Sequence, residues 1–177
     1  LSNEKNIDFM IDALAELKKS TDKAFRLLIV GDGHQKQRLQ AKIDELGLTQ
    51  TIQLVGSVAP ENMANWYQLG DAFLFASQSE TQGMVILEAM AAGLPVVAVR
   101  SSGIDDVVED GFNGYKTPAK QAVWLERVER ILNDESLRKE LSDNAESFAK
   151  AYSVERFSQD VRHIYAETLA RYHEAKN

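Results

Sequence analysis

Four short apolar runs recur along the first two thirds of the 177-residue chain, and glycine, proline or a polar turn follows each run. Runs of this kind are typical of strands that are buried on both faces of a parallel sheet. The predicted strands are Phe25–Val30, Thr51–Gly56, Asp71–Ala76 and Leu94–Val99.

Helical spacing of apolar residues fills the stretches around these runs. One predicted helix precedes the first run, one ends at Gly47, one begins near Pro60, and one opens at Gly83. The apolar positions of the first three are Ile7, Met10, Ile11, Leu14 and Leu17, then Leu39, Ile43 and Leu46, then Met63, Trp66, Tyr67 and Leu69. Alternating strands and helices predict the α/β class, with a Rossmann-like, doubly wound parallel sheet and right-handed crossovers.

The pattern changes after two turn signals, Asp110-Gly111 and Asn113-Gly114. Three C-terminal helices are predicted beyond them, at residues 120–132, 135–150 and 154–174. We therefore expect an α/β domain over residues 1–153 and a terminal helical segment over residues 154–177, which could pack toward a further domain.

Composition narrows the function classes. The net charge of −7 disfavours a broad nucleic-acid surface, and the absence of cysteine excludes thiolate catalysis and thiolate metal sites. The three histidines, His34, His163 and His173, match no metal spacing, so we expect no metal. Trp66 and Trp124 are interpreted as core aromatics, and His34 as a polar loop residue beside a turn.

The first segment of the sequence does not resemble a signal peptide. The start, LSNEKN, lacks the basic and apolar regions of a signal peptide, and no stretch is long enough for a transmembrane helix. A cytoplasmic protein is expected, and the start at Leu1 is interpreted as a cut within a longer gene.

The first candidate motif is the turn Val30–Gly33 at a strand end. It is no dinucleotide fingerprint, because Lys36 stands where a third glycine is needed, and no Walker sequence occurs. What remains is a tight turn at the carboxyl end of a strand, which is where ligands bind in open α/β sheets. A binding role and a purely structural turn stay equally open.

The second candidate is the pair Glu80 and Glu88, which arises by chance at this spacing about once in such a chain, so context decides. Glu80 follows a predicted strand, and Gly83 opens a helix whose first amides, from Met84 and Val85, suit a phosphate. Glu88 lies about one and a half turns into that helix and could accept sugar hydroxyls. Apolar neighbours predict that the helix is largely buried and that Glu88 needs a partner, rather than being a solvated surface residue.

These segments resemble the C-terminal, nucleotide-sugar-binding half of retaining GT-B glycosyltransferases of family four, also called group 1. The resemblance covers nearly the whole chain, through EKNID, LLIVGDG, IQLVGSV, the run from residue 71 to 99, SSGIDDVVEDGFNGY and the last helix with Phe157 and Tyr165. Glu80 and Glu88 match the family's E-x7-E signature in register with strand and helix.

The resemblance implies a role for each candidate residue. Glu80 would be catalytic at the donor sugar, Glu88 would bind the ribose, and Lys5 would neutralise the diphosphate. Donor-binding residues would be Lys5, Gly31, Gly33, Val58, Thr81, Gln82, Gly83, Met84, Val85 and Glu88. The reaction implied is transfer of a hexose with retention, without metal or other cofactor, from a UDP-linked donor; SETQG resembles members that glucosylate a lipid from UDP-glucose, and a polysaccharide acceptor is equally open.

Two departures from the family carry expectations. The strand that precedes Leu1 in the family is central in the sheet, so the sheet should have an internal gap or borrow a strand. The acceptor-binding N-terminal domain is absent too, so we expect weak UDP binding without transfer, and membrane contact only through that other half. The alternative to an enzyme is that the chain is a nucleotide-binding α/β module without catalytic activity.

Overall fold

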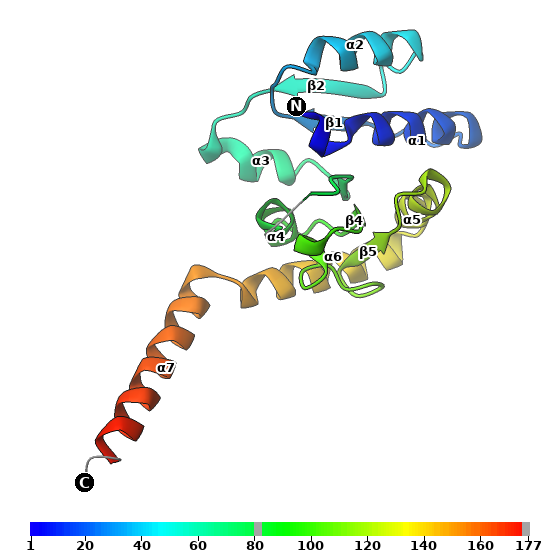
Figure 1. The fold of residues 1–177 in the computed structure, drawn as a ribbon. Helices are drawn as coiled ribbons and strands as arrows, with labels where there is room; N and C mark the ends of the chain where they lie inside the picture. Colours follow the sequence, from blue (N-terminus) through cyan, green and yellow to red (C-terminus); the bar gives the residue numbers. More distant parts are fainter. Residues whose placement is uncertain (80–82, 175–177) are drawn as a thin grey trace.

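A computed structural model describes residues 1–79 and 83–174 of the chain, and its strands form two parallel sheets (Figure 1). One sheet pairs two strands, and the other orders three strands as β3-β4-β5. The strands are β1 (Leu27–Val30), β2 (Ile52–Gly56), β3 (Phe73–Phe75), β4 (Val96–Val99) and β5 (Gly114–Thr117). The first four fall inside the predicted runs, which confirms the α/β class, and β5 was not predicted because its sequence GYKT contains one large apolar side chain.

Seven α-helices connect and follow these strands within the described residues, and they agree with the predicted helices to within a few residues. Short 3-10 helices precede α1 and α3 and follow β4, at Asn3–Lys5, Pro60–Asn62 and Ser102–Ile104. The α-helices are α1 (Ile7–Ser20), α2 (Lys36–Glu45), α3 (Met63–Tyr67), α4 (Met84–Ala91), α5 (Gln121–Asn133), α6 (Glu135–Ala151) and α7 (Val154–Glu174).

The sheet is split where the sequence predicted a gap. In the described part of the chain β1 pairs only with β2, and β3 pairs only with β4. All four residues of β4 are buried because both faces of the strand are covered: Val97 and Val99 pack in one apolar cluster with α1 and α5, and Val96 and Ala98 pack in another with α4 and α6. Three of four residues in β1 and two of three in β3 are only half-buried, so burial on both faces was a wrong expectation for these strands.

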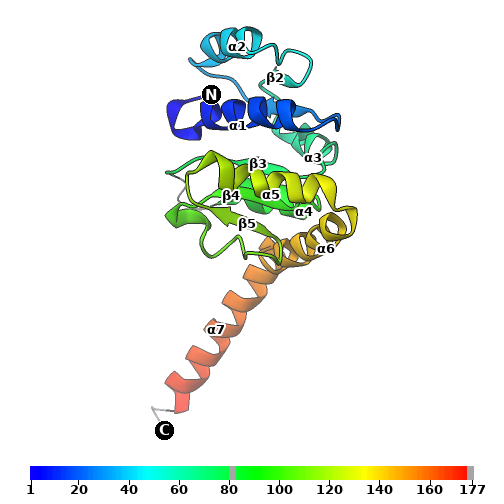
Figure 2. The same ribbon diagram turned by 90° about the vertical axis from the view of Figure 1, so that its right-hand side faces the viewer.

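Helix α1 joins the two half sheets. One apolar cluster includes Ile11 and Leu14 of α1, Ile29 of β1, Val97 of β4 and Trp124 of α5. Figure 2 shows α1 between the β1–β2 part and the part with α5. The halves are therefore held together by side-chain packing, since no strand pair links them within the described residues.

The tryptophans differ in burial. Trp124 is fully buried, and its ring meets Phe9 of α1 edge-on with 5.7 Å between centroids, which confirms a core role. Trp66 is only half-buried and lines a cavity between the half sheets.

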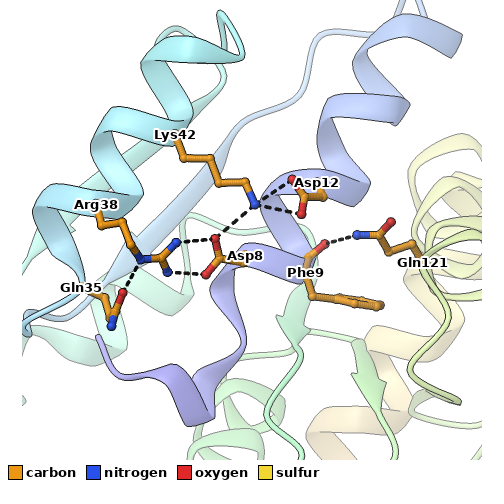
Figure 3. Close-up of polar contacts among 7 residues, drawn as sticks. All are labelled: Asp8, Phe9, Asp12, Gln35, Arg38, Lys42 and Gln121. Atoms are coloured by element: carbon orange, nitrogen blue, oxygen red, sulfur yellow. Dashed lines mark hydrogen bonds and ion pairs between the residues drawn. The ribbon is translucent and has the colours of Figure 1, made fainter.

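Ion pairs fix α1 to α2 along their exposed edge (Figure 3). The Arg38 guanidinium binds both carboxylate oxygens of Asp8, with 2.9 Å between Nη1 and Oδ1. The Lys42 ammonium lies 3.1 Å from Asp8 Oδ1 and 2.8 Å from Asp12. The hydrogen bond from Arg38, followed by the contribution of Lys42, lowers the pKa of Asp8 to about 2.

Helix α7 extends away from the rest of the molecule (Figure 1). It exposes the large apolar side chains of Ile164, Tyr165, Leu169 and Tyr172. The division into residues 1–153 and 154–177 stays a prediction. None of the described helices combines the length and hydropathy needed to cross a bilayer.

Replacing Ile11 tests the bridging role of α1. Ile11 is fully buried, so Ile11→Ala should lower the free energy of unfolding by about 2–5 kcal/mol through lost packing and a cavity. Urea denaturation measures this change. Leu46→Ala, at a side chain 43% exposed, is the control and should change stability by less than about 1 kcal/mol; equal losses in both variants would contradict the role of α1.

The ion pairs between α1 and α2 predict that the stability of the folded protein depends on pH. Because the pKa of Asp8 is lower in the folded protein than in the unfolded chain, its contribution is complete above about pH 4 and disappears as the pH falls toward about 2. Thermal unfolding across this range should therefore be less acid-sensitive for Asp8→Asn than for the parent. Asp22→Asn, at an exposed position, is the control, and parallel curves for all three proteins would refute the effect.

Candidate functional site

The candidate residues gather at the carboxyl ends of the parallel strands. Gly31 and Gly33 follow β1, Val58 follows β2, and Gly83 begins α4 in the connection after β3. Val58 is half-buried and His34 is exposed in the turn after β1. Ligands of open α/β sheets bind along this edge, which makes it the candidate site.

The first six residues run along this edge and contact both half sheets. The Leu1 amino group donates to the carbonyl of Asp32 after β1, and the Asn6 side chain donates to the carbonyl of Ala76 after β3, at 3.3 Å. Lys5 is exposed, and its Nζ lies 6.0 Å from the ring centroid of Phe75. Lys5 therefore lies beside the carboxyl end of β3.

Glycine is required in the turn after β1 for two different reasons. Gly31 has a φ of 128°, which side chains rarely adopt, and its amide donates to the Gly56 carbonyl at 2.7 Å. A Cβ at Gly33 would overlap the backbone of Leu1. Gly33 therefore lies directly against the backbone of Leu1.

Asp32 lies between these glycines, and its carboxylate accepts hydrogen bonds from groups of the same turn and of the helix that follows. It accepts hydrogen bonds from Lys36 Nζ at 2.9 Å and from the Gly33 amide at 2.7 Å, and these bonds lower the pKa of Asp32. Lys36 therefore lies beside the turn as a paired cation.

Helix α4 begins at a glycine that no other residue can replace without strain. Gly83 is buried in the left-handed region with φ 63°, and a Cβ would lie 3.0 Å from the Gly103 carbonyl and 3.3 Å from a methyl of Val107. Its carbonyl accepts from Ile86 at 2.9 Å, which closes the first turn. The amides of Met84 and Val85 have no acceptor inside the helix, so they and the helix dipole favour an anion there.

Glu88 is exposed, so the expectation of a buried carboxylate was wrong. The apolar residues on either side of it point into the core, while position 88 falls on the outer side of α4. The expected partner does exist, because the Tyr67 hydroxyl donates to Glu88 Oε2 at 3.0 Å. Burial, and next the hydrogen bond to Glu88, raise the pKa of Tyr67 well above its ordinary value, so Tyr67 stays a donor at neutral pH.

Three predicted site residues, Glu80, Thr81 and Gln82, lie outside the described residues, so their roles stay predictions. The remaining predicted residues fall into separate groups: Gly31 and Gly33 after β1, Val58 after β2, Lys5 beside Phe75 of β3, and Gly83, Met84, Val85 and Glu88 at and within α4.

Sequence reasoning missed Asn6 and Tyr67. Asn6 has φ 51° and is the one described non-glycine residue with positive φ, a conformation in which asparagine is enriched. That preference was a usable signal, whereas nothing local links Tyr67 to a carboxylate 21 residues further on.

Comparison with known proteins agrees with this arrangement. The family described as glycosyl transferases group 1 matches residues 1–148. The chain belongs to this family.

Alpha-monoglucosyldiacylglycerol synthase of Acholeplasma laidlawii is 32% identical over 169 residues, which are 96% of this chain and 42% of that protein. An uncharacterised glycosyltransferase of Methanocaldococcus jannaschii is 30% identical over 93% of this chain and 45% of its own length. The chain thus spans less than half the length of these relatives.

Solved group 1 glycosyltransferases share the fold. Anabaena HepE in complex with UDP-glucose superposes with a TM-score of 0.78 and 28% identity, over 97% of this chain and 46% of that one. The fold class predicted from the sequence, one half of a GT-B glycosyltransferase, is confirmed.

The Tyr67–Glu88 contact predicts a titration shift. In Glu88→Gln the carboxylate no longer disfavours the tyrosinate, so the pKa of Tyr67 should fall while burial keeps it above normal. Ultraviolet titration at alkaline pH measures this, and the curve of Tyr67→Phe identifies the share of this one tyrosine. Identical curves for the parent and Glu88→Gln would show that the two side chains are not in contact.

Proposed function

We propose that this chain is the donor-binding half of a glycosyltransferase that transfers a hexose from a nucleotide diphosphate sugar, with UDP-glucose as the favoured donor. The distal phosphate would bind at the start of α4, and Glu88 would accept the ribose hydroxyls. Lys5 would offset the diphosphate charge from the other side of the edge.

The observation that carries this proposal is the geometry of α4. The glycine at its start holds a left-handed backbone conformation and accepts a hydrogen bond from Ile86 at 2.9 Å, so the amides of Met84 and Val85 have a defined direction. Glu88 is exposed and oriented by Tyr67, so its carboxylate can accept further hydrogen bonds from a ligand. An anion site and a hydroxyl acceptor on one helix suit a molecule that carries both a phosphate and a sugar ring.

Two relatives support the choice of donor and acceptor. The Acholeplasma protein is named for synthesis of a glucosylated diacylglycerol, and the Anabaena structure holds UDP-glucose. We infer a UDP-linked hexose donor and a lipid or polysaccharide acceptor, and the acceptor would be bound by a second domain.

Retention and independence of metal belong to the same proposal. The helix dipole, the amides of α4 and Lys5 would stabilise the leaving diphosphate where its charge develops, which is the task that a metal ion performs in other transferases. Glu80 is proposed to face the donor sugar. A cytoplasmic location stays a prediction.

Titration of the chain with UDP tests the ribose role. Glu88→Ala should raise the Kd for UDP roughly tenfold or more, because hydrogen bonds to a charged group are lost, and isothermal calorimetry measures the change. Glu140→Ala, at an exposed position in α6, is the matched control and should bind UDP as the parent does. Glu80→Gln should also leave UDP affinity nearly unchanged, since UDP lacks the sugar that Glu80 is proposed to face.

Three results would count against this assignment. An unchanged Kd for Glu88→Ala would remove Glu88 from the nucleotide site. Absence of UDP binding by the parent would remove the site itself. Binding of UDP together with an equal loss in the Glu140→Ala control would indicate a general charge effect.

A further inference from the structure

The side chain of Tyr67 is held in place by neighbours on several sides. Tyr67 is the last residue of α3 and is buried, and its ring belongs to an apolar cluster with Ala89 of α4 and with Leu94. The ring of Phe73 in β3 meets it edge-on, with 5.9 Å between the centroids and 71° between the ring planes. Because the ring is packed in this way, the core of the molecule sets the direction of its hydroxyl group.

This hydroxyl group orients a carboxylate on the outer side of α4. It donates to Glu88 Oε2 at 3.0 Å, and among the described residues Tyr67 is the one hydrogen-bond partner of the Glu88 side chain. A carboxylate offers about four acceptor positions, so most of them remain open to a ligand. Glu88 therefore combines a defined orientation with acceptor positions that face solvent.

An oriented glutamate differs from an ordinary surface glutamate in what ligand binding costs. A free glutamate side chain samples several rotamers, and a ligand that fixes it loses part of the binding free energy to that ordering. At Glu88 the ordering already takes place in the folded protein, through the hydrogen bond from Tyr67. Hydrogen bonds from a ligand to this carboxylate consequently contribute more to net affinity.

A fixed carboxylate also distinguishes more sharply between similar ligands. The two free hydroxyls of a ribose lie on adjacent carbons, so a carboxylate held in one orientation can accept hydrogen bonds from both. A ligand without the 2′-hydroxyl loses one charge-assisted hydrogen bond, and a fixed carboxylate cannot turn to recover it. A mobile carboxylate would turn toward the remaining hydroxyl or toward water, and the difference between the two ligands would be smaller.

We propose that Tyr67 is a positioning residue that gives this site its preference for ribonucleotides over 2′-deoxyribonucleotides. Its hydroxyl group acts through Glu88 rather than on the ligand. The proposal rests on the proposed role of Glu88 at the ribose, and it adds the residue that sets the selectivity of that contact.

Binding of UDP and of 2′-deoxy-UDP to the chain and to its Tyr67→Phe variant tests the proposal. The parent should bind UDP roughly tenfold or more tightly than 2′-deoxy-UDP, because the lost hydrogen bond goes to a charged group. Tyr67→Phe keeps the ring and removes only the hydroxyl group, so this ratio should fall by roughly threefold to tenfold, mainly through weaker binding of UDP. Titrations followed by nuclear magnetic resonance measure the Kd values. Inorganic pyrophosphate, which has no ribose, should bind both proteins equally.

Two further variants separate positioning from a general effect on the fold. Tyr115→Phe makes the same change at another buried tyrosine, which lies in β5 against Arg127 and Arg130, and it should keep the parent's ratio. In Glu88→Ala the ratio should be about one, and adding Tyr67→Phe to that variant should change it no further, since the two residues act as a unit. A merely structural role of Tyr67 would lower the free energy of unfolding and leave the ratio of the folded protein unchanged.

The outcomes distinguish this proposal from the ribose assignment on which it rests. If the parent prefers UDP and Glu88→Ala abolishes the preference, an unchanged ratio in Tyr67→Phe overturns the positioning role alone. A parent that binds no UDP, or binds both nucleotides equally, overturns the ribose role and the positioning role together. A further loss from Tyr67→Phe in the Glu88→Ala background would show that Tyr67 contacts the ligand directly, and an equal loss for pyrophosphate would show a change in α4 as a whole; either result overturns the proposal.

Discussion

The packing of α1 is the interaction on which the rest of the structure depends. Parallel sheets are normally continuous through hydrogen bonds, but here the continuity is provided by one apolar helix face that contacts both halves. Met10, Ile11 and Leu14 meet the core, while Asp8 and Asp12 on the outer side hold α2. Because burial is non-directional and hydrogen bonds are directional, α1 can join the halves without fixing a strand register between them.

Sequence patterns predicted the strands and helices well because each depends on local periodicity. The run before Gly31 and the i, i+3, i+4 spacing in α1 needed no knowledge of distant residues. Strand β5 was missed because its pairing with β4, rather than its composition, makes GYKT a strand. Glu88 was predicted to be buried because its neighbours are apolar. Successive residues of a helix point in different directions, however, so Glu88 is exposed between neighbours that face the core.

The candidate site was predictable only in part, for a similar reason. In the sequence, Gly31 and Gly33 indicate a turn and Gly83 indicates the start of a helix. In the structure all three have positive φ and follow the carboxyl ends of strands. The contacts that orient the site join residues far apart along the chain. Asn6 meets Ala76 across 70 positions, and Tyr67 meets Glu88 from another helix. Such pairs follow from the tertiary fold and leave no periodic signal.

The split sheet has a mechanical consequence for the carboxyl edge. Gly31 and Val58 belong to one half, whereas Gly83 and Glu88 belong to the other, so the span between them is set by side-chain packing. Apolar packing is non-directional, whereas the hydrogen bonds of a strand ladder fix one register. Any small molecule that touches both halves therefore orders them at one separation, and the entropy lost in this ordering reduces its net binding free energy.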